Sequence, residues 1–114
     1  MDQRYLIDTN AIIDAQMGKI PDNGMEFMAT IINKEFLISF VSYIEFLGYK
    51  NISSQSEAFI SLANVIEINK DIIDRCIALR KSKRINLPDA IIAATALTQN
   101  LIIVSRNTKD FAQH

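Results

Sequence analysis

The sequence has few of the residues that build disulfide-bonded folds or nucleophilic active sites. Cysteine occurs once, at Cys76, so no intrachain disulfide can form. A single cysteine is compatible with a reducing compartment, and we expect a cytoplasmic protein. Histidine also occurs once, as the final residue His114. Ser-His or Cys-His catalysis is therefore disfavoured, because neither nucleophile has an imidazole base within the body of the chain.

Long apolar runs are missing as well. No stretch approaches the ~20 apolar residues that a membrane-spanning helix needs. The N-terminus leads directly into a strand-like segment without the apolar core of a signal peptide. Only three glycines and two prolines occur in 114 residues, which predicts short connections. We therefore expect a soluble protein with no membrane partner and a single domain, residues 1–114.

The apolar residues that are present predict an α/β fold. Four largely apolar segments, at 4–8, 37–41, 65–68 and 101–104, are expected to be strands, and the first is continuously apolar between its ends, as is typical of a buried strand. Helical spacing lies between them, and we expect helices over 11–17, 25–34, 44–49, 58–62, 70–83 and 88–99, with a further short helix after the fourth strand. This alternation predicts a central parallel sheet of about four strands with helices on both faces.

The segment from Leu87 to Leu97 is the most informative of these helices. It carries one charge, Asp89, followed by eight uncharged residues. A helix that is apolar on every face must be buried on every side, so we expect it at the centre of the fold. Pro88 fits the first turn and places Asp89 beside the positive end of the helix dipole. Considered alone, Asp89 is a helix cap; the alternative is a cation shared with other carboxylates.

Two segments have the Ser-x-x-Glu spacing of a capping box, in which a serine and a glutamate satisfy the free N–H groups of a helix start. The first pairs Ser42 with Glu45, and the second pairs Ser54 with Glu57. Capping alone accounts for Glu45 if that residue is considered by itself. Glu57 is assigned only a capping role. Cys76 falls on the apolar face of its helix, which favours a core position over a nucleophile.

Four acidic residues share one topological position. Asp8, Glu45, Asp89 and Asp110 each follow a strand or lie in the first turn of a helix. In a parallel sheet these positions lie along one edge, so the side chains can converge. Clustered carboxylates repel unless a cation lies between them, and oxygen ligands without histidine or cysteine favour Mg²⁺ or Mn²⁺ over Zn²⁺. The expected chemistry is metal-assisted hydrolysis of a phosphodiester.

The formal net charge of −1 does not exclude an anionic substrate. If a metal neutralises the four acids, the rest of the chain carries +3. Four positive charges fall within residues 80–84, at Arg80, Lys81, Lys83 and Arg84. This run is either a solvated helix end that complements the helix dipole or a patch that contacts phosphates, and the sequence favours neither.

At these positions the chain resembles the PIN-domain ribonucleases, in particular the small VapC-type toxins of toxin–antitoxin pairs. Four segments carry the resemblance in the family's order and span almost the whole chain. They are Leu6-Ile7-Asp8-Thr9-Asn10, Ser42 with Glu45, Leu87-Pro88-Asp89-Ala90-Ile91-Ile92-Ala93, and Ser105-Arg106-Asn107-Thr108-Lys109-Asp110-Phe111.

The resemblance implies an endoribonuclease that depends on Mg²⁺ or Mn²⁺. Asp8 and Asp89 would be the main metal ligands, Glu45 would complete the acidic cluster, and Asp110 would be a fourth acid. The implied supporting and RNA-contacting residues are Thr9, Ser105 and Asn107 for positioning, and Arg80, Lys81, Lys83, Arg84, Arg106 and Lys109 for the RNA backbone. The implied partners are RNA, a VapB-like antitoxin that blocks the acidic pocket, and a second copy of the chain in a homodimer.

One difference from the family and two other functions bear on this interpretation. Family members continue past Asp110-Phe111 into another strand, so we expect a sheet without that edge strand. A phosphoacceptor receiver domain needs an acidic pair after its first strand, which Asp8-Thr9-Asn10 does not provide. A PIN-like module that binds RNA or protein without catalysis is favoured by the short C-terminus and disfavoured by the four acids.

Overall fold

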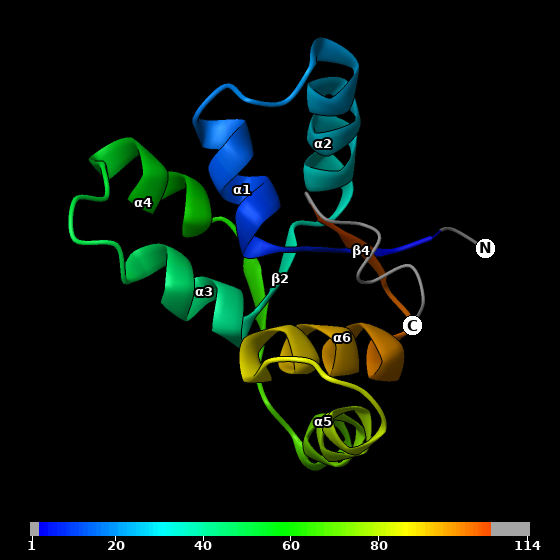
Figure 1. The fold of residues 1–114 in the computed structure, drawn as a ribbon. Coiled ribbons are helices and arrows are strands. Elements are labelled where there is room, and N and C mark those ends of the chain that lie inside the picture. Colours follow the sequence, from blue (N-terminus) through cyan, green and yellow to red (C-terminus); the bar gives the residue numbers. More distant parts are fainter. Residues whose placement is uncertain (1–2, 106–114) are drawn as a thin grey trace.

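The computed structural model describes residues 3–105 and contains the predicted elements in the predicted order (Figure 1). They are β1 (Tyr5–Ile7), α1 (Thr9–Gln16), α2 (Asp22–Lys34), β2 (Leu37–Ser39), α3 (Phe40–Leu47), α4 (Ser54–Ile60), β3 (Asn64–Ile66), α5 (Lys70–Ser82), α6 (Leu87–Gln99) and β4 (Ile102–Val104). The helix expected after β4 falls outside the described residues. Within residues 3–105, no helix combines the length and apolar character needed to cross a bilayer.

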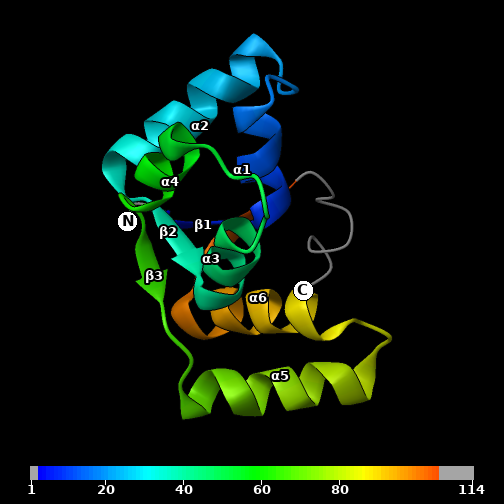
Figure 2. The same ribbon diagram turned by 90° about the vertical axis from the view of Figure 1, so that its left-hand side faces the viewer.

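The strands are parallel, as predicted, but they form two pairs. β1 pairs with β4, with Leu6 opposite Ile103, and β2 pairs with β3, with Ile38 opposite Val65. β1 and β2 lie in contact between these pairs, although the described strands form no hydrogen-bonded ladder there. Helices α1, α2 and α4 lie on one side of the strands, and α5 and α6 lie on the other (Figures 1 and 2). The α/β prediction is confirmed, with the sheet divided between β1 and β2.

Helix α6 is central, as its uniform apolar character predicted. Ile92 packs in one core cluster with Leu6 of β1, whereas Ala94 packs in another with Cys76 of α5. A third cluster fills the space between the strands, α1 and α2. The short alanine side chains let α5 pack directly on α6, so the helix is covered from two directions. Cys76 is buried there, which supports its assignment to the core.

The ends of α6 show which residue caps it. The side chain of Asn86 accepts a hydrogen bond from the backbone N–H of Asp89 at 2.9 Å, so Asn86 is the cap. Pro88 lies in the first turn, and Asn100 ends the helix in the left-handed conformation, with φ of 57°. The interpretation of Asp89 as the cap is therefore wrong. Its carboxylate is available for another role.

The start of α3 differs from the prediction. Ser39 caps the helix and accepts a hydrogen bond from the N–H of Val41 at 3.1 Å, so β2 ends two residues earlier than expected. Phe40 and Val41 are apolar because they pack against the core from a helix rather than from a strand. Ser42 consequently lies inside the helix, and the capping box that joined it to Glu45 is wrong.

Two further boundaries shift for similar reasons. Ser53, rather than Ser54, caps α4 by accepting a hydrogen bond from the N–H of Ser56 at 3.0 Å. Glu57 lies in the first turn of that helix, and its backbone N–H donates to the carbonyl of Ser53 at 3.0 Å, whereas the Ser53 hydroxyl accepts from Ser56. β3 spans Asn64–Ile66, so it begins one residue before the predicted range 65–68 and ends two residues before the end of that range. Its extent is set by pairing with β2.

The two serines of α3 give a direct test of this helix start. Ser39 Oγ satisfies a backbone N–H, whereas Ser42 Oγ is fully buried without a hydrogen-bond partner among the described residues. We expect Ser39→Ala to lower the free energy of unfolding by about 1 kcal/mol. Ser42→Ala should leave it unchanged or raise it, because removing an unsatisfied buried hydroxyl removes a desolvation cost. Urea unfolding of both variants measures the difference, and equal losses would contradict the assignment of the cap.

Candidate active site

Three of the four predicted acids lie on or directly before helices of the described structure. Asp8 follows β1 and is the N-cap of α1, and Asp89 lies in the first turn of α6, which follows α5. Glu45 was predicted in a first helical turn, but it lies in the second half of α3, because that helix begins at Phe40. We call these three residues the acidic edge. Asp110, the fourth predicted acid, lies outside the described residues.

Asp8 is buried and is held by hydrogen bonds to both carboxylate oxygens. Only 4% of the residue is exposed. Oδ1 accepts from the backbone N–H of Thr9 at 2.8 Å, and Oδ2 accepts from the hydroxyl of Ser105 at 3.0 Å. The N–H of Asp8 donates to the carbonyl of Val104 at 2.9 Å, which extends the pairing of β1 with β4. The position and orientation of this carboxylate are therefore fixed by both strands.

Thr9 connects Asp8 to Glu45. The Thr9 hydroxyl donates to Oε1 of Glu45 at 2.8 Å, and Thr9 is buried whereas Glu45 is exposed. A continuous set of hydrogen bonds thus runs from Ser105 after β4, through Asp8 and Thr9, to Glu45 on α3. Two of the three residues predicted to have positioning roles, Thr9 and Ser105, directly contact a predicted acid. The third, Asn107, lies outside the described residues.

The charge of Asp8 is disfavoured by its surroundings. Burial raises the pKa of this carboxyl above its ordinary value, and hydrogen bonds from Ser105 and Thr9 oppose that rise. The negative charges of Asp89 and Glu45 raise the pKa further. Coulomb interactions weaken with distance, so this effect indicates that the three acids act on a common region. A cation bound at the acidic edge would stabilise the ionised carboxylates.

The donor chemistry of the acidic edge fits a hard divalent cation. Carboxylate oxygens are the ligands that Mg²⁺ and Mn²⁺ prefer. Among residues 3–105, no group of three or more acidic, histidine or cysteine side chains is arranged to hold a metal by itself. Mg²⁺ commonly uses one or two carboxylates and retains several waters, so it does not require such a group. Asp8 and Asp89 are the residues that would hold it.

Four of the six basic residues predicted to contact RNA lie among the described residues. Arg80 and Lys81 lie in the last turn of α5, and Lys83 is its C-cap. The connection from Lys83 through Arg84 leads directly to Asn86, the cap of α6. This places the basic run just before the helix turn that carries Asp89. Two other candidates, Arg106 and Lys109, lie outside the described residues.

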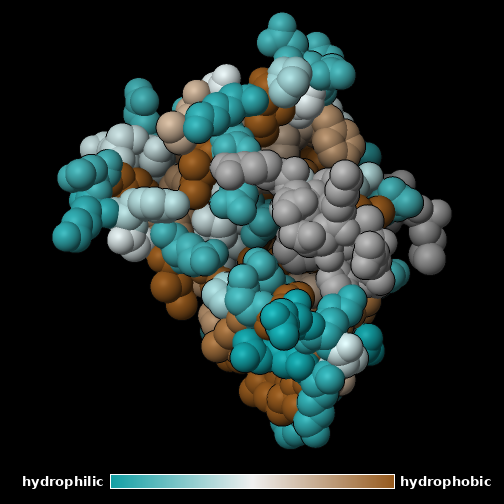
Figure 3. Space-filling model, in the orientation of Figure 1, coloured by the Kyte–Doolittle hydropathy of each residue, from teal (hydrophilic) through white to brown (hydrophobic). Residues whose placement is uncertain are grey.

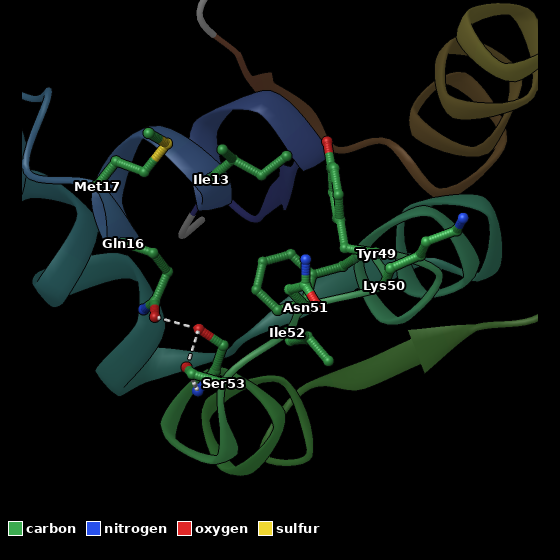
Figure 4. A pocket seen from close by; sticks show the side chains of 10 residues that line it. Ile13, Gln16, Met17, Tyr49, Lys50, Asn51, Ile52 and Ser53 are labelled. Carbon is green, nitrogen blue, oxygen red and sulfur yellow. Dashed lines mark hydrogen bonds between the residues drawn. The ribbon is translucent and has the colours of Figure 1, made fainter.

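Sequence reasoning missed a groove between α1 and the end of α3, with a volume of about 720 Å³ (Figure 4). Ile13 and Met17 of α1 line it, together with Tyr49 and Asn51, which follow α3. These residues are more than 30 positions apart in the chain, so no local pattern could have brought them together. The available signal in the sequence was an aromatic residue, Tyr49, at the end of a predicted helix. In the structure Tyr49 is 56% exposed.

Comparison with known proteins identifies the family of this chain. The family model described as the PIN domain matches residues 5–114. The chain belongs to the PIN domain family. The resemblance inferred from the four sequence segments is thereby confirmed. A comparison of this PIN domain with curated protein sequences finds no match.

Solved structures that match this PIN domain include toxin–antitoxin complexes. A toxin–antitoxin complex from Klebsiella pneumoniae has a chain that is 33% identical, with a TM-score of 0.75, covering 95% of this chain and 90% of that one. VapBC-1 from nontypeable Haemophilus influenzae is 23% identical, with a TM-score of 0.73 and coverage of 96% and 91%. DNA-bound VapBC from Salmonella typhimurium is 20% identical, with a TM-score of 0.76 and coverage of 97% and 92%. At these last two identities, the likeness shows the fold alone.

The raised pKa of Asp8 predicts how the metal-free protein responds to pH. Because the folded state raises this pKa, folding favours the protonated carboxyl. The resulting stabilisation is fully present below the unfolded pKa of about 3.9 and is lost as pH rises through the higher folded value. We expect Asp8→Asn, which retains an oxygen to accept from the Thr9 N–H, to lack this loss.

Urea unfolding in EDTA across acidic and neutral pH measures this difference. Wild-type protein should lose more free energy of unfolding than Asp8→Asn between acidic and neutral pH, and the variant should be at least as stable at pH 7. A variant that follows the wild-type pH dependence would show that burial does not disfavour the Asp8 charge.

Proposed function

We propose that this PIN domain is an endoribonuclease that hydrolyses RNA phosphodiester bonds with Mg²⁺ or Mn²⁺, as the toxin of a toxin–antitoxin pair. The observation that carries the proposal is the buried carboxylate of Asp8, held by Ser105 and Thr9 beside the charges of Asp89 and Glu45. Membership of a nuclease family supports hydrolysis of nucleic acid. The matches to toxin–antitoxin complexes support the toxin assignment.

The residues of the acidic edge have separate tasks in this mechanism. A divalent ion held by Asp8 and Asp89 would activate water and stabilise the leaving oxygen. The two hydrogen bonds to Asp8 hold its carboxylate in one orientation, which preorganises the ligand. Glu45 shares one oxygen with the Thr9 hydroxyl and is exposed, so its other oxygen can accept a hydrogen bond from the attacking water. Asp110 and Asn107 remain in the proposal as a fourth acid and a positioning residue.

Two protein partners belong to the proposal. A cognate antitoxin would block the acidic edge, and a second copy of the chain would form a homodimer. The matched solved complexes support the antitoxin, and the family resemblance supports the homodimer. Apolar surface lies between hydrophilic side chains on one face of the molecule (Figure 3). Ile44 of α3 and Ile73 and Ile77 of α5 are exposed. Exposed aliphatic side chains of this kind are typical of protein contact surfaces.

Cleavage of RNA by variants of the acidic edge tests the mechanism. We expect cleavage with added Mg²⁺ or Mn²⁺ and none in EDTA. Asp8→Asn and Asp89→Asn should each lower the rate by more than about 100-fold, since loss of a ligand should exceed the loss seen for groups that merely orient ligands. Glu57→Gln is the control, because Glu57 lies in the first turn of α4. Equal cleavage in EDTA would reject the metal mechanism.

Removal of the group that orients Asp8 is a milder change. Ser105→Ala takes away the hydroxyl that donates to Oδ2 at 3.0 Å. We expect metal affinity or cleavage to fall by about 10–100-fold, which is typical for residues that orient a metal ligand. Titration with Mn²⁺, followed by the RNA cleavage rate, measures the change. An unaltered Mn²⁺ dependence would show that Ser105 does not orient the ligand.

The salt dependence of RNA binding tests the basic run. Lys81 lies in the last turn of α5 near Asp89, whereas Lys34 lies in the last turn of α2, before β2 begins. If Lys81 contacts a phosphate, Lys81→Ala should make the slope of log K against log salt shallower by about 0.7 for single-stranded RNA. Lys34→Ala is the matched control and should leave the slope unchanged. Anisotropy of labelled RNA in EDTA provides the measurement, and equal slopes for all three proteins would place the RNA elsewhere.

A further inference from the structure

The groove between α1 and the end of α3 begins beside the acidic edge. Thr9 of α1 and Glu45 of α3 are joined by a hydrogen bond of 2.8 Å. Ile13 and Tyr49, which line the groove, lie four residues farther along the chain from these two. Thr9 and Ile13 lie in the same helix, so they are about one helical turn, or roughly 5.4 Å, apart, whereas Tyr49 lies beyond the end of α3. On the α1 side, the groove therefore begins about one turn from the hydrogen bond between Thr9 and Glu45.

Hydrogen bonds connect α1 and α4 within the lining of the groove. The Ser56 hydroxyl donates to Oε1 of Gln16 at 2.9 Å, and the Ser53 and Ser56 hydroxyls lie 3.0 Å apart (Figure 4). These contacts tie the end of α1 to the start of α4. The walls of the groove are thus held in place without a ligand.

The lining of the groove has the chemistry of a nucleobase site. Tyr49 exposes more than half of its surface, and Ile13 and Met17 provide an apolar wall from α1. Asn51 carries an amide that can donate to and accept from the edge of a base. Lys50 supplies a positive charge, and no acidic residue is among the described lining residues. Unpaired bases stack on aromatic rings and are read along their edges, whereas their phosphates need cations.

We propose that this groove is a subsite for one unpaired nucleobase adjacent to the scissile phosphate, with Tyr49 as the residue on which the base stacks. The inference rests on the proposed function, because the base must belong to the RNA at the acidic edge. It makes Tyr49 a determinant of where single-stranded RNA is cut. Pairing of that base in a duplex would remove it from the groove.

Binding of short single-stranded RNA in EDTA tests the subsite apart from catalysis. We expect Tyr49→Ala to weaken binding by about tenfold, within the range measured for loss of one stacked base. Tyr49→Phe retains the ring and should bind like wild type. Tyr43→Ala is the matched control, because Tyr43 is an exposed tyrosine of α3, six positions before Tyr49, that does not line the groove. Thermal unfolding should show that all three variants remain folded.

RNAs that lack a single base at one position then show which base of the RNA stacks on Tyr49. Removing the base that Tyr49 stacks should weaken binding to wild-type protein by about the same factor as Tyr49→Ala, and removing both partners should add no further loss. Independent, multiplicative losses at every position would overturn the inference. Unchanged RNA binding by Tyr49→Ala, with weakened binding of an antitoxin segment, would assign the groove to protein and overturn it as well.

The outcomes separate this inference from the proposed function. Metal-dependent cleavage with equal kcat/KM for wild type and Tyr49→Ala would retain the nuclease and reject the subsite. RNA binding that depends on Tyr49 without cleavage in Mg²⁺ or Mn²⁺ would retain the subsite and reject the nuclease, in favour of a non-catalytic RNA-binding module. Absence of RNA binding would reject both.

Discussion

The burial of one carboxylate, that of Asp8, is the constraint on which the rest of the structure depends. The same residue ends β1, extends the β1 and β4 pair through its N–H, and caps α1 through its side chain. Its charge is therefore placed by the backbone of two strands and one helix, and it cannot turn toward water without disrupting them. Folding thus holds a negative charge where it is poorly solvated, and cation binding would offset that cost.

Capping residues leave the other two acids free for chemistry. Asn86 satisfies the start of α6, and Ser39 satisfies the start of α3, so neither Asp89 nor Glu45 is needed to cap its helix. Glu45 instead accepts from the hydroxyl of Thr9, the residue after Asp8. Short polar side chains thus satisfy backbone N–H groups at the starts of both helices, and the acids are not needed for that role.

The sequence predicted those features that depend on local pattern or on topology. The order of elements, the buried helix α6 and its end at Asn100 follow from periodicity and turn chemistry. The boundary between β2 and α3 could not be predicted, because Phe40 and Val41 are equally apolar in a buried strand or a buried helix. The separation of β1 from β2 and the groove at Tyr49 depend on how elements pack, which no local segment specifies.

The bond between Ser105 and Asp8 joins residues 97 positions apart. β1 pairs with β4, so the hydrogen bonds of the first strand cannot form until the last described strand has been synthesised. During translation, the N-terminal half of the chain would therefore leave the ribosome without a completed acidic edge. The proposed nuclease would thus be assembled only after nearly all of its polypeptide had been synthesised, which separates production of the chain from the onset of the proposed activity.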